Sequence, residues 1–132
     1  MVKIVIELCC YLENKPGNLA EVAKRLAEKK ININGIVTYE GQLQSLVRIA
    51  VDNVDLAEKV LRGMGVDLVS RYELLEVDVI NKVGGLAKIA AVLGENGINI
   101  ESIYATGGGT EYALAYIRVS DLDQAKSILE NL

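Results

Sequence analysis

A short polar loop occurs twice in the sequence, and its residue types could bind a small charged molecule. Asn14-Lys15-Pro16-Gly17-Asn18-Leu19 is matched by Asn81-Lys82-Val83-Gly84-Gly85-Leu86, at an offset of 67 residues (81 − 14). An Asn amide can donate and accept hydrogen bonds together, which suits the ammonium and carboxylate of a zwitterion. A glycine lets the backbone approach a ligand closely, and a helix that begins after the loop favours a carboxylate at its N-terminus.

A second asparagine follows each loop at the same spacing. Asn32 lies in Ile31-Asn32-Ile33, and Asn99 lies in Ile98-Asn99-Ile100, where strands are expected. Neighbours on a strand point to opposite faces, so each Asn should point away from the core face of its flanking isoleucines. A purely structural interpretation is that the glycines only shape a tight loop and the asparagines only cap backbone. Because the whole pattern occurs twice, we favour binding.

The repeat extends beyond the loops and predicts the elements that position them. Apolar alternation over residues 4–12 and 75–79 predicts a strand before each loop, and helical spacing of apolar residues predicts a helix after it. Asn18 with Glu21 predicts a capping box at the first helix. Two strands and a second helix follow in each copy, at 31–39, 45–52 and near Asn53, then at 98–106, 112–119 and near Asp121. This order predicts α+β units, with helices on one face of an antiparallel sheet.

The two copies are not equal. The second copy has one extra residue near Gly107-Gly108-Gly109, in an expected hairpin turn. Val66 to Arg71 could form a fourth strand for the first copy, but the second copy has no such strand after its last helix. Either the strand is cut off, or an edge is open, or a strand from elsewhere fills the place. Since Val66–Val79 is nearly continuous extended sequence, an exchange of strands between halves or chains is one hypothesis. We divide the chain into domains 1–70 and 71–132.

The duplicated Asn-Lys-x-Gly-x-Leu loops and the Ile-Asn-Ile segments strongly resemble the ACT domain family. The resemblance covers nearly the whole chain as two tandem ACT domains, and small stand-alone tandem ACT proteins are the most similar. It implies two ferredoxin-like βαββαβ units, the second without its own last strand, that bind amino acids for regulation. In the family, ligands typically lie between two ACT domains joined edge to edge through their second strands.

The resemblance also implies which residues contact the ligand. In serine-sensing members the loop Asn and the later Asn do so, which corresponds to Asn14 with Asn32 and to Asn81 with Asn99. A His two residues before the loop Asn contributes there, but this chain has Leu12 and Val79, so a more apolar amino acid is expected. The second loop has Val83 where the first loop has Pro16, so the two sites should differ. The predicted binding residues are Asn14, Lys15, Pro16, Gly17, Asn18, Leu19, Asn32, Asn81, Lys82, Val83, Gly84, Gly85, Leu86 and Asn99.

Composition argues against several other functions. The net charge of −4 without a basic block argues against nucleic acid, and no apolar stretch reaches the roughly 20 residues of a membrane span. An acylphosphatase-like enzyme or an RNA-binding sheet could share this element order. The absence of His leaves no visible nucleophile–base pair, and scarce aromatics weaken the RNA alternative. We interpret Tyr11, Tyr72, Tyr112 and Tyr116 as a partner or dimer surface instead.

The two adjacent cysteines, Cys9 and Cys10, should point to opposite faces of a strand, which makes a disulfide between them or a metal site improbable. They suggest a reducing cytoplasm. We therefore expect a cytoplasmic, non-catalytic sensor of a free amino acid, without metal or cofactor, that forms a homodimer. The alternative is a regulatory subunit that acts by binding an enzyme of amino-acid metabolism.

Overall fold

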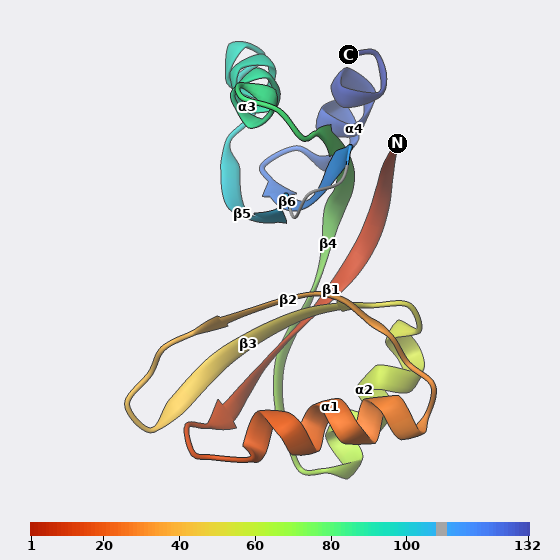
Figure 1. Cartoon of the computed structure of the whole chain (residues 1–132), viewed down its shortest axis with the longest axis vertical. Helices are drawn as coiled ribbons and strands as arrows, with labels where there is room; N and C mark the ends of the chain where they lie inside the picture. The colour runs from red at the N-terminus through yellow and green to blue at the C-terminus, as the bar shows by residue number, and fades with distance from the viewer. Residues whose placement is uncertain (108–110) are drawn as a thin grey trace. The chain divides into compact units, whose positions relative to one another are not determined.

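The computed structural model describes residues 1–107 and 111–132, and it shows an α+β protein with a six-stranded antiparallel sheet (Figure 1). The strand order is β2-β3-β1-β4-β6-β5. The described elements are β1 (Val2–Glu13), α1 (Asn18–Glu28), β2 (Ile33–Tyr39), β3 (Gln44–Val51), α2 (Val54–Gly63), β4 (Asp67–Ile80), α3 (Gly85–Glu95), β5 (Ile100–Thr106), β6 (Tyr112–Val119) and α4 (Leu122–Glu130). None of the helices in these ranges is long and apolar enough to cross a membrane. Of the turn at 107–109, where the extra residue is expected, residues 108 and 109 lie outside the described residues.

The chain divides into two compact units. The first unit is Ile6–Tyr72, and the second unit combines Met1–Val5 with Glu73–Leu132. The long strands β1 and β4 each contribute residues to both units. The expected division into 1–70 and 71–132 places residues 1–5 differently and stays a prediction.

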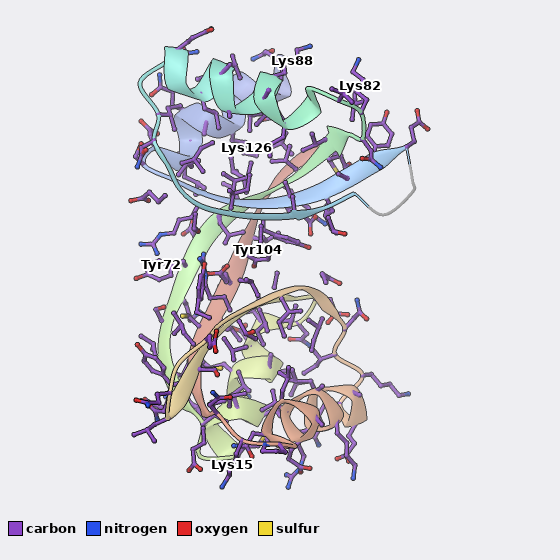
Figure 2. The ribbon with its side chains drawn as sticks, turned by 60° about the vertical axis from the view of Figure 1, so that its left-hand side comes forward. Lys15, Tyr72, Lys82, Lys88, Tyr104 and Lys126 are labelled. Atoms are coloured by element: carbon purple, nitrogen blue, oxygen red, sulfur yellow. The ribbon has the colours of Figure 1, made fainter. Side chains whose placement is uncertain are left out.

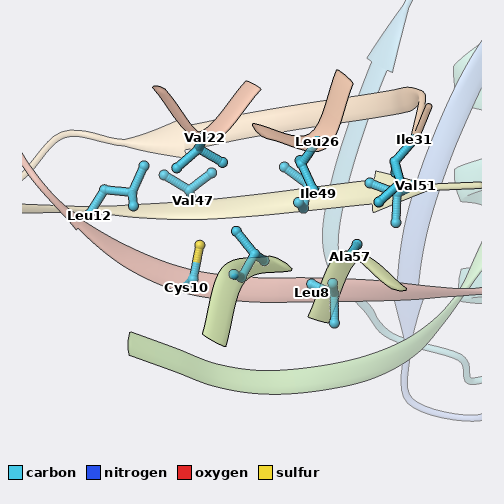
Figure 3. Packing of buried hydrophobic residues seen from close by; sticks show 11 residues of the cluster. Leu8, Cys10, Leu12, Val22, Leu26, Ile31, Val47, Ile49, Val51 and Ala57 are labelled. Carbon is cyan, nitrogen blue, oxygen red and sulfur yellow. The ribbon is translucent and has the colours of Figure 1, made fainter. Parts of the chain in front are cut away.

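The first unit has the order β-α-β-β-α-β and a core between its helices and one face of its sheet. Leu8, Cys10 and Leu12 alternate along β1 and pack on this face, as the period of two predicts (Figure 3). Val22 and Leu26 of α1 cover them with the apolar stripe of that helix. The buried core residues are Leu8, Cys10, Leu12, Val22, Leu26, Ile31, Val47, Ile49, Val51, Ala57 and Leu61.

The second unit obtains its fourth strand from the beginning of the chain. The Asp78 N–H donates to the Met1 carbonyl oxygen at 3.1 Å, and Lys3 Nζ lies 2.9 Å from the Glu76 carboxylate. Val2 packs against the core of this unit. On its other side β4 pairs with β6, from Leu75 opposite Ile117 to Ile80 opposite Tyr112. The hypothesis that a strand from elsewhere fills this place is therefore confirmed.

The helix starts show two correct predictions and one wrong prediction. The side chains of Asn53 and Asp121 accept hydrogen bonds from Leu56 N and Gln124 N, so both expected N-caps of α2 and α4 are confirmed. The capping box at α1 is wrong. Gly17 is the N-cap, and Asn18 is already the first helical residue, so its amide instead donates to the Glu13 carbonyl oxygen at 3.0 Å.

Candidate ligand site

The asparagine that begins each loop connects it to the hairpin turn at the same end of its sheet. Asn14 Nδ2 donates to the Gly41 carbonyl oxygen at 2.6 Å, and Asn81 Nδ2 donates to the Gly107 carbonyl oxygen at 2.9 Å. The equivalent bond in both units shows that the sequence repeat is also a structural repeat. Each amide thus has a structural role, and this bond directs one of its donor groups to the protein backbone.

Both loop glycines take the left-handed backbone conformation at the helix N-cap. Gly17 has a φ of 88° and Gly84 a φ of 86°. A Cβ atom at either position would meet no other heavy atom within 4 Å. The backbone conformation alone therefore explains both glycines, because residues with a Cβ are strained there. The open space beside each glycine leaves its backbone accessible.

A small hollow of about 180 Å³ lies beside the first loop. It brings several predicted residues together with side chains of β2 and β3. Its lining residues are Leu12, Glu13, Asn14, Lys15, Asn18, Leu19, Thr38, Ser45 and Val47. Neither Pro16, Gly17 nor Asn32 belongs to this lining.

A larger cavity, of about 570 Å³, lies beside the second loop. It includes Lys82, Val83, Gly84 and Gly85 from the predicted set, and Figure 2 shows Lys82 and Lys88 around the start of α3. Its other lining residues are Met1, Val2, Val77, Asp78, Val79, Ile80, Lys88, Ile89, Leu129, Glu130 and Leu132. Asn81, Leu86 and Asn99 do not line it. The walls from the chain start and from α4 were missed, because they are far in sequence from the loop.

The two asparagines of each predicted site lie at opposite ends of the same edge strand. Asn14 is bonded to the turn that follows β2, whereas Asn32 precedes β2, a strand of seven residues. At about 3.3 Å per residue, this separates them by roughly 20 Å. The same holds for Asn81 and Asn99 across β5. A single unit therefore cannot bring both asparagines to one ligand of amino-acid size.

Asn32 and Asn99 are exposed and held through their backbones. Asn32 N donates to the Asp52 carboxylate at 3.0 Å, and Asn99 N donates to Ser120 Oγ at 2.9 Å. The Asn32 amide also donates to the side-chain oxygen of Asn34 at 2.6 Å. As predicted, both side chains lie off the core face.

The sheet face opposite the helices carries buried polar groups in both units. In the first unit, Arg48 Nε donates to the Glu7 carboxylate at 2.7 Å, and Arg48 also donates to the Tyr39 hydroxyl at 3.2 Å. In the second unit, Tyr116 donates to the Glu76 carboxylate at 2.7 Å and stacks on Tyr104. Burial raises the pKa of Tyr116, and the hydrogen bond to Glu76 adds to this.

The tyrosine surface expected from the sequence needs one correction. Tyr116 is only 3% exposed, because β6 is an inner strand of the sheet and Glu76 and Tyr104 cover the ring. Tyr11, Tyr72 and Tyr112 are exposed. Both cysteines are free thiols, and burial raises the pKa of Cys10 to about 11.

Residues 74–132 match the family model of the ACT domain. This segment of the chain is thus similar to an ACT domain. The match confirms the recognition made from the two loops and supports a regulatory, ligand-binding role. No curated protein sequence matches the chain.

Solved structures are similar to the whole chain in fold. Protein BT0572 from Bacteroides thetaiotaomicron is similar with a TM-score of 0.89 and 28% identity, covering 98% of this chain and 89% of that one. The regulatory subunit of aspartate kinase from Thermus thermophilus, in a ligand-free form, has a TM-score of 0.70 and 18% identity, covering 99% and 94%. E. coli aspartokinase III, in complex with aspartate and ADP, has a TM-score of 0.61 and 19% identity, covering 97% and 31%. The two kinase likenesses show a shared fold.

Proposed function

We propose that this protein is a tandem pair of ACT units that senses a free amino acid without catalysing a reaction. The first unit is one repeat, and the second unit, completed by residues 1–5, is the other. The observation that carries the proposal is the duplicated loop. In both units an asparagine fixes the loop to a hairpin, and a left-handed glycine then begins the helix with accessible backbone.

The positions of the asparagines support a site made by two units. Asn14 of one unit can lie near Asn32 or Asn99 of another only if the two edge strands run side by side in opposite directions. The strands β2 and β5 are the two edges of the sheet, so among the described strands each has one side without a partner. Ile36 and Ile103 take corresponding positions on these strands and are 41% and 38% exposed. We propose that copies of the chain pair through these edges as a homodimer.

The residues near the loops favour an apolar amino acid. Leu12 lines the hollow of the first unit and Val79 lines the cavity of the second, at the positions where serine-sensing relatives carry His. Neither side chain can donate a hydrogen bond to a polar ligand side chain. The apolar surface instead favours aliphatic ligand side chains.

A thermal-shift screen of the twenty amino acids tests this function. A ligand that binds only the folded protein stabilises it by mass action, by about 2.7 kcal/mol at a ligand concentration of 100 times Kd. Its melting temperature therefore rises. We expect one or a few aliphatic amino acids to raise it. No shift with any amino acid would contradict the proposal.

Asn32→Ala and Asn99→Ala are the sharpest variants for the same screen. Both side chains are exposed and their backbones hold them in place, so truncation should leave the fold intact. Each variant should weaken binding at the sites to which it contributes. Asn131→Ala, at the end of α4, is the matched control. Equal ligand shifts in all three variants would remove these asparagines from the site.

A second function is a regulatory subunit that binds an enzyme of amino-acid metabolism. The fold shared with the regulatory subunit of aspartate kinase favours it. Native purification from its source, followed by mass spectrometry, should then recover such an enzyme, and recovery should change with the amino acid. A homodimer recovered without an enzyme would favour the stand-alone sensor.

A further inference from the structure

Asn34 interrupts the regular pairing of the edge strand β2, close to the predicted ligand residue Asn32. The register of β2 against β3 shifts between Ile33 and Gly35, so Asn34 is one extra residue in the edge strand. Such a β-bulge turns the side chain of the extra residue in a new direction, and bulges are frequent at sheet edges and next to active sites. The exposed Asn34 side chain meets Asn32, whose Nδ2 donates to Asn34 Oδ1 at 2.6 Å.

This hydrogen bond fixes the Asn32 amide in one orientation. Asn32 N donates to the Asp52 carboxylate at 3.0 Å, which holds the backbone, and the bond to Asn34 then occupies one N–H group of Nδ2. Within residues 1–107 and 111–132, no group donates to Asn32 Oδ1. The Asn32 amide oxygen is therefore held in place on an exposed side chain as an acceptor without a donor from these residues.

The loop asparagine of the first unit has the same polarity. Asn14 Nδ2 donates to the Gly41 carbonyl oxygen at 2.6 Å, and none of the described residues donates to Asn14 Oδ1. When two first units pair through their edge strands, Asn14 of one copy and Asn32 of the other present their amide oxygens to the same ligand. An ammonium group only donates hydrogen bonds, whereas a carboxylate only accepts them. Two fixed acceptors therefore suit the ammonium pole of an amino acid.

The second unit has the same bulge with a different residue. The register of β5 against β6 shifts between Ile100 and Ser102, so Glu101 is the extra residue there. Its carboxylate lies 3.8 Å from Arg118 Nε, and in the part of the chain that the structure describes the Asn99 side chain forms no hydrogen bond. The fixed acceptor thus depends on the residue type at the bulge and is a property of the first unit.

We propose that Asn34 is a positioning residue, which holds the Asn32 amide so that its oxygen accepts a hydrogen bond from the ammonium group of the bound amino acid. This inference rests on the proposed sensor function and adds the pole of the ligand that Asn32 recognises. It restricts the ligand to amino acids with a free α-ammonium group. A carboxylic acid with the same hydrocarbon skeleton lacks the donor and leaves the amide oxygens unpaired.

NMR titration of the intact chain, followed at the side-chain amide signal of Asn32, tests the ligand pole. The probes are L-leucine, L-isoleucine and L-valine, and the matched acids without the ammonium group are isocaproate, β-methylvalerate and isovalerate. We expect an amino acid to shift the signal at a concentration at least about tenfold lower than its matched acid, the ratio that about 1.4 kcal/mol gives. Equal titrations by an amino acid and its matched acid would overturn this proposal. No shift with any of the three amino acids up to about 10 mM would contradict the sensor function itself, and this inference with it.

Two substitutions at position 34 test the positioning role in the same titration. Asn34→Ala removes the acceptor of the 2.6 Å bond, so the Asn32 amide loses its fixed orientation and amino-acid binding should weaken by about threefold to tenfold. Asn34→Asp keeps an acceptor and should retain the affinity of the unaltered chain. Glu101→Ala, at the equivalent bulge of the second unit, is the matched control and should leave the Asn32 titration unchanged. Unchanged affinity in Asn34→Ala, or an equal loss in all three variants, would overturn the proposal.

Asn32→Asp decides which pole of the ligand lies beside this side chain. A carboxylate at this position still accepts from an ammonium group, but it repels a ligand carboxylate. We expect amino-acid binding by Asn32→Asp, measured by thermal shift, to equal or exceed that of the unaltered chain, while an unchanged backbone amide NMR spectrum verifies folding. Binding that is lost in Asn32→Asp but normal in the unaltered chain would overturn the assigned pole and leave the sensor function intact.

Discussion

Gly85 in the second unit and Asn18 in the first follow loop glycines of the same left-handed conformation, but their surroundings differ. A Cβ on Gly85 would lie 2.2 Å from the Ile80 carbonyl oxygen, whereas the Asn18 amide donates to the carbonyl oxygen of Glu13, the residue equivalent to Ile80. The two loops therefore share a backbone turn but close it differently. The duplicated motif thus keeps its conformation while the contacts around it change.

The two units also differ in the polar pairs on the sheet faces opposite their helices. The first unit buries the ion pair of Glu7 and Arg48, whose side chains are 0% and 8% exposed. In the second unit Glu76 accepts from the Tyr116 hydroxyl and pairs with Lys3, which is itself exposed. Removing one partner of a fully buried ion pair leaves an uncompensated buried charge and costs much stability. Removing one partner of a pair that reaches solvent costs little. The two units should therefore respond unequally to matched substitutions.

The largest difference should follow from deleting residues 1–5. These residues supply the strand beside β4, and the partly buried Val2 and Val5 with the hydrogen bond between Met1 and Asp78 contribute on the order of 5 kcal/mol. We expect the second unit to unfold at lower urea than the first, as followed by methyl NMR of both cores. Lys3→Ala, which removes only a surface ion pair, is the control. Simultaneous unfolding with an unchanged midpoint would show that these residues are dispensable.

The next effect is a substitution of the buried carboxylate. Glu7→Ala leaves the Arg48 guanidinium buried without this partner and should lower the free energy of unfolding by about 4 kcal/mol. Glu76→Ala leaves a neutral hydroxyl and an exposed lysine, so about 1–2 kcal/mol is expected. Urea unfolding measures both, with the exposed Glu73→Ala as reference. Equal losses for the two variants would contradict the distinction between the two faces.

Exchanging the residue after the loop glycine should give a smaller, one-sided effect. Gly85→Asn forces a side chain against the Ile80 backbone and should cost about 3 kcal/mol, whereas Asn18→Gly loses one exposed hydrogen bond and costs about 1 kcal/mol. Thermal unfolding of the two variants measures the difference. A well-tolerated Gly85→Asn would mean that the second loop can close as the first does.

The smallest effect is a loss of stability at alkaline pH. Burial raises the pKa of Cys10 from 9.0 to about 11, so the folded protein favours the neutral thiol. This contribution is fully present below pH 9 and is lost as pH rises through 11, by about 2 kcal/mol at pH 11. Cys10→Ala should flatten the alkaline decrease in urea midpoint, while Cys9→Ala should not. The raised pKa of Tyr116 has the same sign and should leave a residual decrease in both variants.

Much of the local structure could be predicted from the sequence. The alternation of Leu8, Cys10 and Leu12 predicts a core strand, and Asn53 and Asp121 predict two helix starts, because these signals depend on neighbouring residues alone. The capping box at Asn18 failed because Gly17 adopts a positive φ and becomes the cap itself. Gly17 and Asn18 are both suited to the N-cap position, and the backbone conformation is needed to know which of them takes it.

The repeated loop and the order of elements within each copy follow from the sequence alone. Periodicity, capping residues and glycines encode these features locally. Long-range contacts instead set three features: Met1–Val5 completes the second unit, Asn14 and Asn32 lie at opposite ends of a strand, and a cavity opens beside Lys82. These features arise from contacts between residues far apart in the chain, which leave no periodic pattern in the sequence.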